Sequence, residues 1–213
     1  MSTRYAVVLI PEPSFTARVY RARQLICGQY ASWAAEMHML HLALTDYFPC
    51  FEEAVESVSQ GLQRIARPIQ TEGRDFGLSH RGIATIPGQT GHMFLDFSAD
   101  ADSQGASAGL SALRVQVLDL LRTAEGAGLA QPAWPEDFPA RIYVMQHANL
   151  PPSVFEGAVD FAKAVVNDLE IPDTTRAWQL MLVRFQSAAA GEDWSDGRWA
   201  ADLSWNIVSA HPL

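Results

Sequence analysis

The sequence predicts an α+β fold built as two lobes. The first observation is the order of the expected elements, β-α-β-α-β-β and then α-β-α-β-β, in which single helices separate the strands without a long parallel βαβ run. The second is an internal similarity, because FEEAVESV from Phe51 and FEGAVDFA from Phe155 each open a helix after a histidine-bearing strand and a proline turn. This duplication predicts two lobes related by a pseudo-twofold axis, with a cleft between them.

The first third of the chain is predicted from the spacing of its apolar residues. A short β-branched run, YAVVLI, favours a buried strand, and Ser14 is a suitable N-cap for the helix after it. MHMLHLALTDYF alternates as a strand does, and the apolar positions of the next segment recur at three to four residues until Pro68. The expected elements are a strand at Tyr5–Ile10, a helix from Ser14, a strand at Met37–Phe48 and a helix at Phe51–Arg67.

The rest of the chain is interrupted by glycine and proline. Two connections are expected, a polar loop at Asp100–Gly109 and a longer segment with three Gly and three Pro at Ala124–Pro139. Helices are expected at Leu110–Arg122 and directly after Pro151-Pro152. The expected strands are Phe76–Ile86, Met93–Phe97, Arg141–His147, Arg176–Gln186 and Arg198–Val208, the last two joined by a hairpin loop that contains Trp194.

Composition excludes several classes of protein. The 213 residues are 48% hydrophobic and 18% charged, as in a globular chain with a real core. A net charge of -9 argues against broad binding to DNA or RNA, whose affinity comes largely from neutralised phosphates. Two cysteines are too few for a disulfide framework or a zinc site. MSTRYAVVLIPEP lacks the pattern of a signal peptide and no apolar run could cross a membrane, so a cytoplasmic location is expected.

His41 is the most informative candidate for chemistry. In LHLALTDYF, period-two geometry places His41, Ala43 and Thr45 on one face of a strand and the leucines on the other. Histidine among small and hydroxyl side chains suits the floor of a polar groove, although a half-buried sheet histidine gives the same pattern. His38 is an odd number of positions away and is expected to point the opposite way, so it is not expected to pair with His41.

Three segments resemble the 2H phosphoesterase superfamily, and in particular its 2′-5′ RNA ligase-like proteins. YAVVLIPEPSFTARVYRARQL resembles the opening strand and helix of that family, and LHLALTDYF resembles its first His-x-Thr/Ser segment. RIYVMQHANLPPSVFEGAVDF resembles the second, and the likeness covers nearly the whole chain. The resemblance implies two antiparallel sheets with flanking helices around a central cleft. It also implies that residues 1–213 form one bilobal domain. The N- and C-terminal segments of the chain form one lobe, and its middle segment forms the other.

The resemblance implies a histidine from each lobe at one phosphate, one as base and one as acid, with a hydroxyl two residues later holding a phosphate oxygen. His41 matches the first histidine, but Ala43 occupies the hydroxyl position, where Thr45 is a partial substitute. For the second motif two registers stay open. One places Ile142 and Val144 at the two motif positions, so that the acid is lost.

The competing register makes His147 the second catalytic histidine and Asn149 the phosphate donor. In either register Arg141 and Tyr143 are candidates for charge and stacking against a nucleotide. The resemblance thus implies a metal-independent cyclic phosphodiesterase with an incomplete second motif.

The expected ligand is a small phosphodiester such as a 2′,3′-cyclic nucleotide or an RNA end, bound by a monomer with no cofactor. The alternative is a degenerate family member that binds a nucleotide or another small ligand without turning it over.

Overall fold

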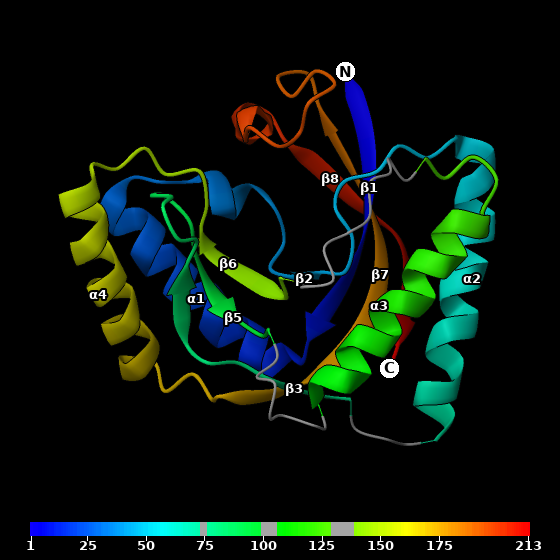
Figure 1. The fold of residues 1–213 in the computed structure, drawn as a ribbon, viewed down its shortest axis with the longest axis horizontal. Coiled ribbons are helices and arrows are strands. Elements are labelled where there is room, and N and C mark those ends of the chain that lie inside the picture. The colour runs from blue at the N-terminus through cyan, green and yellow to red at the C-terminus, as the bar shows by residue number, and fades with distance from the viewer. Residues whose placement is uncertain (73–75, 99–105, 129–138) are drawn as a thin grey trace.

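Two antiparallel sheets organise the computed structural model, which describes residues 1–72, 76–98, 106–128 and 139–213 (Figure 1). The larger sheet has the order β2-β1-β7-β3, with β8 also paired to β7, and the smaller has the order β4-β5-β6. The strands of the larger sheet are β1 (Ser2–Pro11), β2 (Leu42–Ala43), β3 (Gly77–Ser79), β7 (Thr174–Ser187) and β8 (Ser204–Pro212). Those of the smaller sheet are β4 (Ile83–Thr85), β5 (Met93–Asp96) and β6 (Arg141–Met145).

Each sheet has its own pair of helices. Helices α1 (Pro13–Tyr30) and α4 (Pro152–Asp168) pack on the smaller sheet, and α2 (Glu52–Thr71) and α3 (Ala106–Thr123) pack on the larger one (Figure 1). Two short 3-10 helices, η1 (Ala34–Met37) and η2 (Arg198–Ala201), contact each other. Among the described residues, no helix has both the length and the hydropathy that crossing a membrane requires.

Strand β1, in the interior of the larger sheet, is buried on both faces, which explains its continuous apolar run. Tyr5, Val7 and Leu9 belong to a core that extends to the helices and the smaller sheet. The β1 residues between and after these, Ala6, Val8 and Ile10, belong to a second apolar cluster on the opposite face. We call this cluster the second core. Its buried members are Ala6, Val8, Ile10, Met181, Val183, Phe185, Ala190, Trp194, Trp199 and Leu203.

The internal similarity corresponds to one strand and one helix on each sheet. Strand β2 leads to α2 on the larger sheet, β6 leads to α4 on the smaller one, and β2 contacts β6. When FEEAVESV and FEGAVDFA are superposed, Ala54 matches Ala158 and Val58 matches Ala162, and all four side chains are buried. The predicted α+β architecture with two antiparallel sheets is therefore confirmed.

Three expected strands differ in extent. Met37–Phe48 contains only the two residues of β2, and the start of Arg198–Val208 is the 3-10 helix η2. Phe76–Ile86 is two strands in different sheets, because the chain turns at Gly82, which has a φ of 82°. His80 fixes this turn, since its Nδ1 accepts from Gly82 N at 3.0 Å and its Nε2 donates to Pro172 O at 3.0 Å.

Residues 106–109 of the expected polar loop belong to α3, and its earlier part lies outside the described residues. The same is true of positions 129–138 in the expected long connection.

Candidate functional site

His41 stands directly before β2, at the edge of the larger sheet. The ring is half-buried, with its centroid 6.4 Å from that of Phe185 in the second core. Its Nδ1 lies 2.8 Å from the carbonyl oxygen of Met39. A carbonyl can only accept a hydrogen bond, so Nδ1 carries the proton and Nε2 of the neutral ring keeps its lone pair.

The neutral form of His41 is strongly favoured. Burial lowers the pKa of its imidazole to about 3, and the neighbouring His38 acts in the same direction. The Met39 carbonyl opposes this shift only in part. His41 is therefore uncharged at neutral pH, which suits a hydrogen-bond acceptor or a weak base.

His38 does pair with His41, contrary to the prediction. The two ring centroids are 5.1 Å apart. The prediction assumed a continuous strand, but the chain leaves η1 and enters the sheet only at Leu42, so the period of two does not apply. The Nε2 of His38 also lies 3.0 Å from Oε1 of Gln146, just beyond β6, which connects the His41 segment to the smaller sheet.

Arg23 of α1 fixes the chain before His41 through hydrogen bonds to backbone carbonyl groups. It is completely buried and donates to Ala35 O at 2.8 Å, to His38 O at 3.0 Å, and to Tyr143 O through two nitrogens at 3.1 and 2.8 Å. Burial lowers the pKa of its guanidinium to about 10, so it remains charged at neutral pH. One cation thus joins the 3-10 turn before His41 to β6.

Arg23→Met is therefore expected to lower the free energy of unfolding by about 2–4 kcal/mol, because buried carbonyls lose charged hydrogen bonds. Urea denaturation at pH 7 measures the loss. Arg21→Met, the same change at an exposed position of the same helix, is the control and is expected to cost much less. Equal losses in the two variants would show that these carbonyl contacts do not stabilise the fold.

The register that places Ile142 and Val144 at the motif positions requires both side chains to face the ligand. In β6 they face the core instead. Ile142 and Val144 are completely buried in the core that contains the apolar residues of α1 and α4. On the other face, the ring of Tyr143 lies 5.6 Å from Phe94 and 6.1 Å from His92. The structure therefore places Tyr143, and not Ile142, among the histidines.

His147 follows β6 in a left-handed backbone conformation, with a φ of 51°. Its half-buried ring lies 4.7 Å from His92 and 5.6 Å from Trp199. Gly197 packs against the same ring so closely that a Cβ there would be 2.4 Å from it. Burial lowers the pKa of His147, and Asp196 opposes this in part.

The two predicted catalytic histidines belong to one chain of rings but do not touch. His41 contacts His38 at 5.1 Å, His38 contacts Trp199 at 5.4 Å, and Trp199 contacts His147. Among the described residues, no ring contact joins His41 to His147 directly. We call His41, His38, Trp199, His147, His92 and Tyr143 the ring chain.

The residues predicted to hold the phosphate differ in exposure and in the partners they contact. Ala43 is half-buried in β2, opposite Val8 of β1. Thr45 is 2% exposed, and its Oγ1 accepts from the backbone N–H of Val7 at 2.9 Å, so this hydroxyl serves the sheet edge. Asn149 is exposed in the turn after His147. Arg141 shares a face with Tyr143, because its guanidinium lies 4.3 Å from the centroid of the Phe94 ring.

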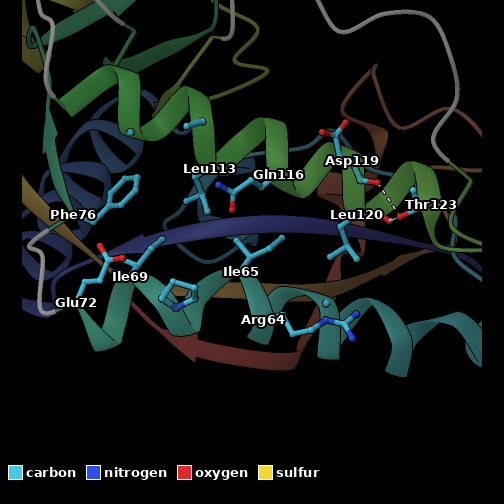
Figure 2. Close-up of a pocket in the computed structure, with 14 residues that line it drawn as sticks. Arg64, Ile65, Ile69, Glu72, Phe76, Leu113, Gln116, Asp119, Leu120 and Thr123 are labelled. Atoms are coloured by element: carbon cyan, nitrogen blue, oxygen red, sulfur yellow. Dashed lines mark hydrogen bonds between the residues drawn. The ribbon is translucent and has the colours of Figure 1, made fainter.

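A cavity of about 640 Å³ lies elsewhere, between α2 and α3 (Figure 2). Its apolar lining includes Ile65 and Leu113, with Arg64 and Asp119 at the rim. The two helices meet where Leu120 packs on Gly61. These helices cover the opposite face of the larger sheet from the second core, so the cavity is separate from the ring chain. Within the described ranges, no three His, Cys, Asp or Glu side chains gather as a metal site.

No protein-family model matches the chain, and no curated protein matches it. Solved structures match it over nearly its whole length. LigT of E. coli, solved with 3′-AMP, is 15% identical with a TM-score of 0.56, and the match covers 99% of this chain and 98% of LigT. A protein described as a phosphoesterase is 12% identical with a TM-score of 0.60, over 100% of this chain and 99% of its own. TT0787 of Thermus thermophilus is 16% identical with a TM-score of 0.55, and the match covers 99% of this chain and 97% of TT0787.

These neighbours are members of one superfamily. The chain has the 2H phosphoesterase fold. The fold class expected from the resemblance is thus confirmed by structures that share few of its residues.

Within this 2H phosphoesterase fold, the sequence analysis named His41, His147 and Tyr143 and missed the other three members of the ring chain. His38 was assigned to the wrong face, and His92 and Trp199 were not singled out as site residues. The sequence does contain a signal for His92. It is a polar residue between Gly91, which has no side chain to cover it, and the apolar start of a strand. Trp199 carries no such signal, because it reaches the histidines only through the folding of the β7–β8 connection.

Proposed function

We propose that the protein binds a small phosphorylated ligand, such as a 2′,3′-cyclic nucleotide or an RNA end, along the ring chain. The observation that carries the proposal is the ring chain itself, which runs from His41 at the larger sheet to Tyr143 on the smaller one. Aromatic and imidazole faces suit a stacked base, and ring nitrogens suit phosphate oxygens. The 2H fold supports the proposal, because LigT has been solved with 3′-AMP and with ATP.

Binding without rapid turnover fits the geometry better than two-histidine catalysis. An acid and a base must each reach the same phosphate directly or through one water. Among the described residues His41 and His147 share no ring contact, and burial lowers the pKa of both, which disfavours the protonated form that the acid needs. The negative net charge of -9 also favours a small ligand over long RNA.

A cyclic phosphodiesterase is the second candidate, and one observation favours it. The Nδ1 of His41 donates to Met39 O, which leaves Nε2 unprotonated as a general base requires. The low pKa of His41, about 3, makes it a weak base, so slow turnover is expected from such an enzyme.

A panel of 2′,3′-cyclic nucleotides and 2′-5′ linked dinucleotides tests both candidates. If the protein binds without turnover, a ligand at about 100 times its Kd stabilises it by about 2.7 kcal/mol, seen as a higher Tm, while chromatography finds the ligand intact. His41→Ala is expected to weaken binding about tenfold. His211→Ala, on β8 and outside the ring chain, is the control.

Turnover that His41→Ala abolishes would establish the phosphodiesterase instead. If no nucleotide in the panel shifts the Tm and none is consumed, both candidates are wrong.

A further inference from the structure

Two buried nitrogen atoms on one face of the smaller sheet have no hydrogen-bond partner. They are Nε of Arg141 and Nδ1 of His92. Buried polar atoms are nearly always paired in folded proteins, so each of these two atoms requires an explanation. Neither residue belongs to the His-x-Thr/Ser positions suggested by the sequence.

The register of the smaller sheet brings these side chains together. Phe94 of β5 pairs with Tyr143 of β6, and Asp96 pairs with Arg141. His92 stands just before β5, and its ring and that of Phe94 both lie against Tyr143, at 6.1 and 5.6 Å, so the two share a face. The Arg141 guanidinium lies over Phe94, 4.3 Å from the ring centroid, and therefore extends along the strand toward His92.

The charge on this face is positive and unbalanced. Asp96, the cross-strand neighbour of Arg141, forms its ion pair with Arg81 at 3.1 Å. No carboxylate among the described residues forms an ion pair with Arg141. The His92 ring lies 4.7 Å from that of His147, and burial, with His147 and Arg141 acting in the same direction, lowers the pKa of His92.

We infer that Arg141 and His92 form an anion subsite that takes the phosphate group of the bound ligand. The guanidinium supplies a planar pair of N–H donors, and a neutral His92 supplies one more from Nδ1. Phe94 beneath the guanidinium keeps its plane fixed, which suits a bidentate contact with phosphate oxygens. The inference rests on the proposed function for the rest of the ligand, whereas the subsite itself requires only an oxyanion.

Calorimetric titrations of the full chain with inorganic phosphate, acetate, 3′-AMP and adenosine test the subsite. The wild-type protein is expected to bind phosphate and 3′-AMP more tightly than acetate. Arg141→Gln and His92→Phe are each expected to weaken phosphate and 3′-AMP about tenfold or more and to leave adenosine unchanged. Arg122→Gln removes the same charge from an exposed ion pair with Asp119 on α3 and is expected to change nothing.

Two further measurements separate the subsite from an effect on folding. Arg141→Lys keeps the charge without the planar fork, and an intermediate affinity is expected. In the 15N spectrum of labelled imidazoles, the His92 resonance of the wild-type protein is expected to move when phosphate is added. Both readouts apply to folded protein, so a general loss of stability cannot imitate them.

The outcomes distinguish the two proposals. If 3′-AMP binds and Arg141→Gln leaves its affinity unchanged, the subsite is wrong and the proposed function stands. If phosphate binds through Arg141 but no nucleotide binds, the subsite stands and the proposed function fails. If neither phosphate nor 3′-AMP binds the wild-type protein, the subsite is overturned.

Discussion

Lowering the pH from 7 to 4.5 is expected to reduce the free energy of unfolding steeply. Burial lowers the pKa of His38 and His92 to about 4 and that of His41 to about 3, while an unfolded histidine has a pKa of about 6.5. Below pH 6.5 these three histidines are therefore protonated in the unfolded chain and still neutral in the folded protein. The stabilisation is complete above pH 6.5 and is lost progressively as the pH falls toward 4.

Each such histidine contributes a slope of up to about 1.4 kcal/mol per pH unit in this window. Since three histidines act in the same direction, a fall in stability of several kcal/mol is expected between pH 7 and 4.5, on the order of the 5–15 kcal/mol of an ordinary domain. Urea denaturation at pH 7, 6, 5 and 4.5 measures the slope. His41→Gln is expected to reduce it by about 1.4 kcal/mol per pH unit.

His211→Gln is the matched control for this experiment. Burial also lowers the pKa of His211, but it lies at the end of β8, away from the ring chain, and a smaller change in slope is expected. A stability that stays constant between pH 7 and 4.5 would contradict the account of neutral, buried histidines.

Gly91→Ala is expected to lower the free energy of unfolding by about 2–5 kcal/mol. Gly91 has a φ of 94°, which an L-residue adopts only with strain. A Cβ at this position would lie 2.1 Å from the backbone oxygen of Ala148, and this backbone cannot move away because Ala148 N donates to Gly91 O at 3.1 Å. The cost combines about 1–2 kcal/mol of backbone strain with about 1–3 kcal/mol of overpacking.

Gly88→Ala separates the two contributions. Gly88 lies in the same turn with a φ of 74°, but a Cβ there would meet nothing within 4 Å. Only the strain is expected, about 1–2 kcal/mol. Urea denaturation of both variants gives the difference, and equal losses would show that the contact with Ala148 is unimportant.

The orientation of residues along 39–44 could be predicted from the sequence, although the strand itself could not. Leu40, Leu42 and Leu44 are buried while His41 and Ala43 are half-buried, as the alternation predicts. The β2 ladder with β1 contains only Leu42 and Ala43, and Arg23 holds the carbonyl groups of Ala35 and His38 in the preceding turn. That constraint comes from a distant helix and leaves no local signal.

The second motif shows where a motif register and the local pattern disagree. Alternation in β6 separates the apolar Ile142 and Val144 from Arg141 and Tyr143, whereas one register of the motif assigned Ile142 to the ligand side. The packing of α1 and α4 decides between them, burying Ile142 and leaving Tyr143 with the histidines. The position of Trp199 depends in the same way on a long connection between β7 and β8.

The pairing of β1 with β7 determines when this protein can fold. Ser2 and Ser187 are hydrogen-bonded neighbours although 185 residues separate them in the chain. During synthesis β1 therefore leaves the ribosome long before β7 is made. Its apolar side chains stay without this partner strand until most of the chain has been synthesised. A chain that ends before Thr174 contains His41 and His147, yet β1 then lacks its neighbour on the side opposite β2.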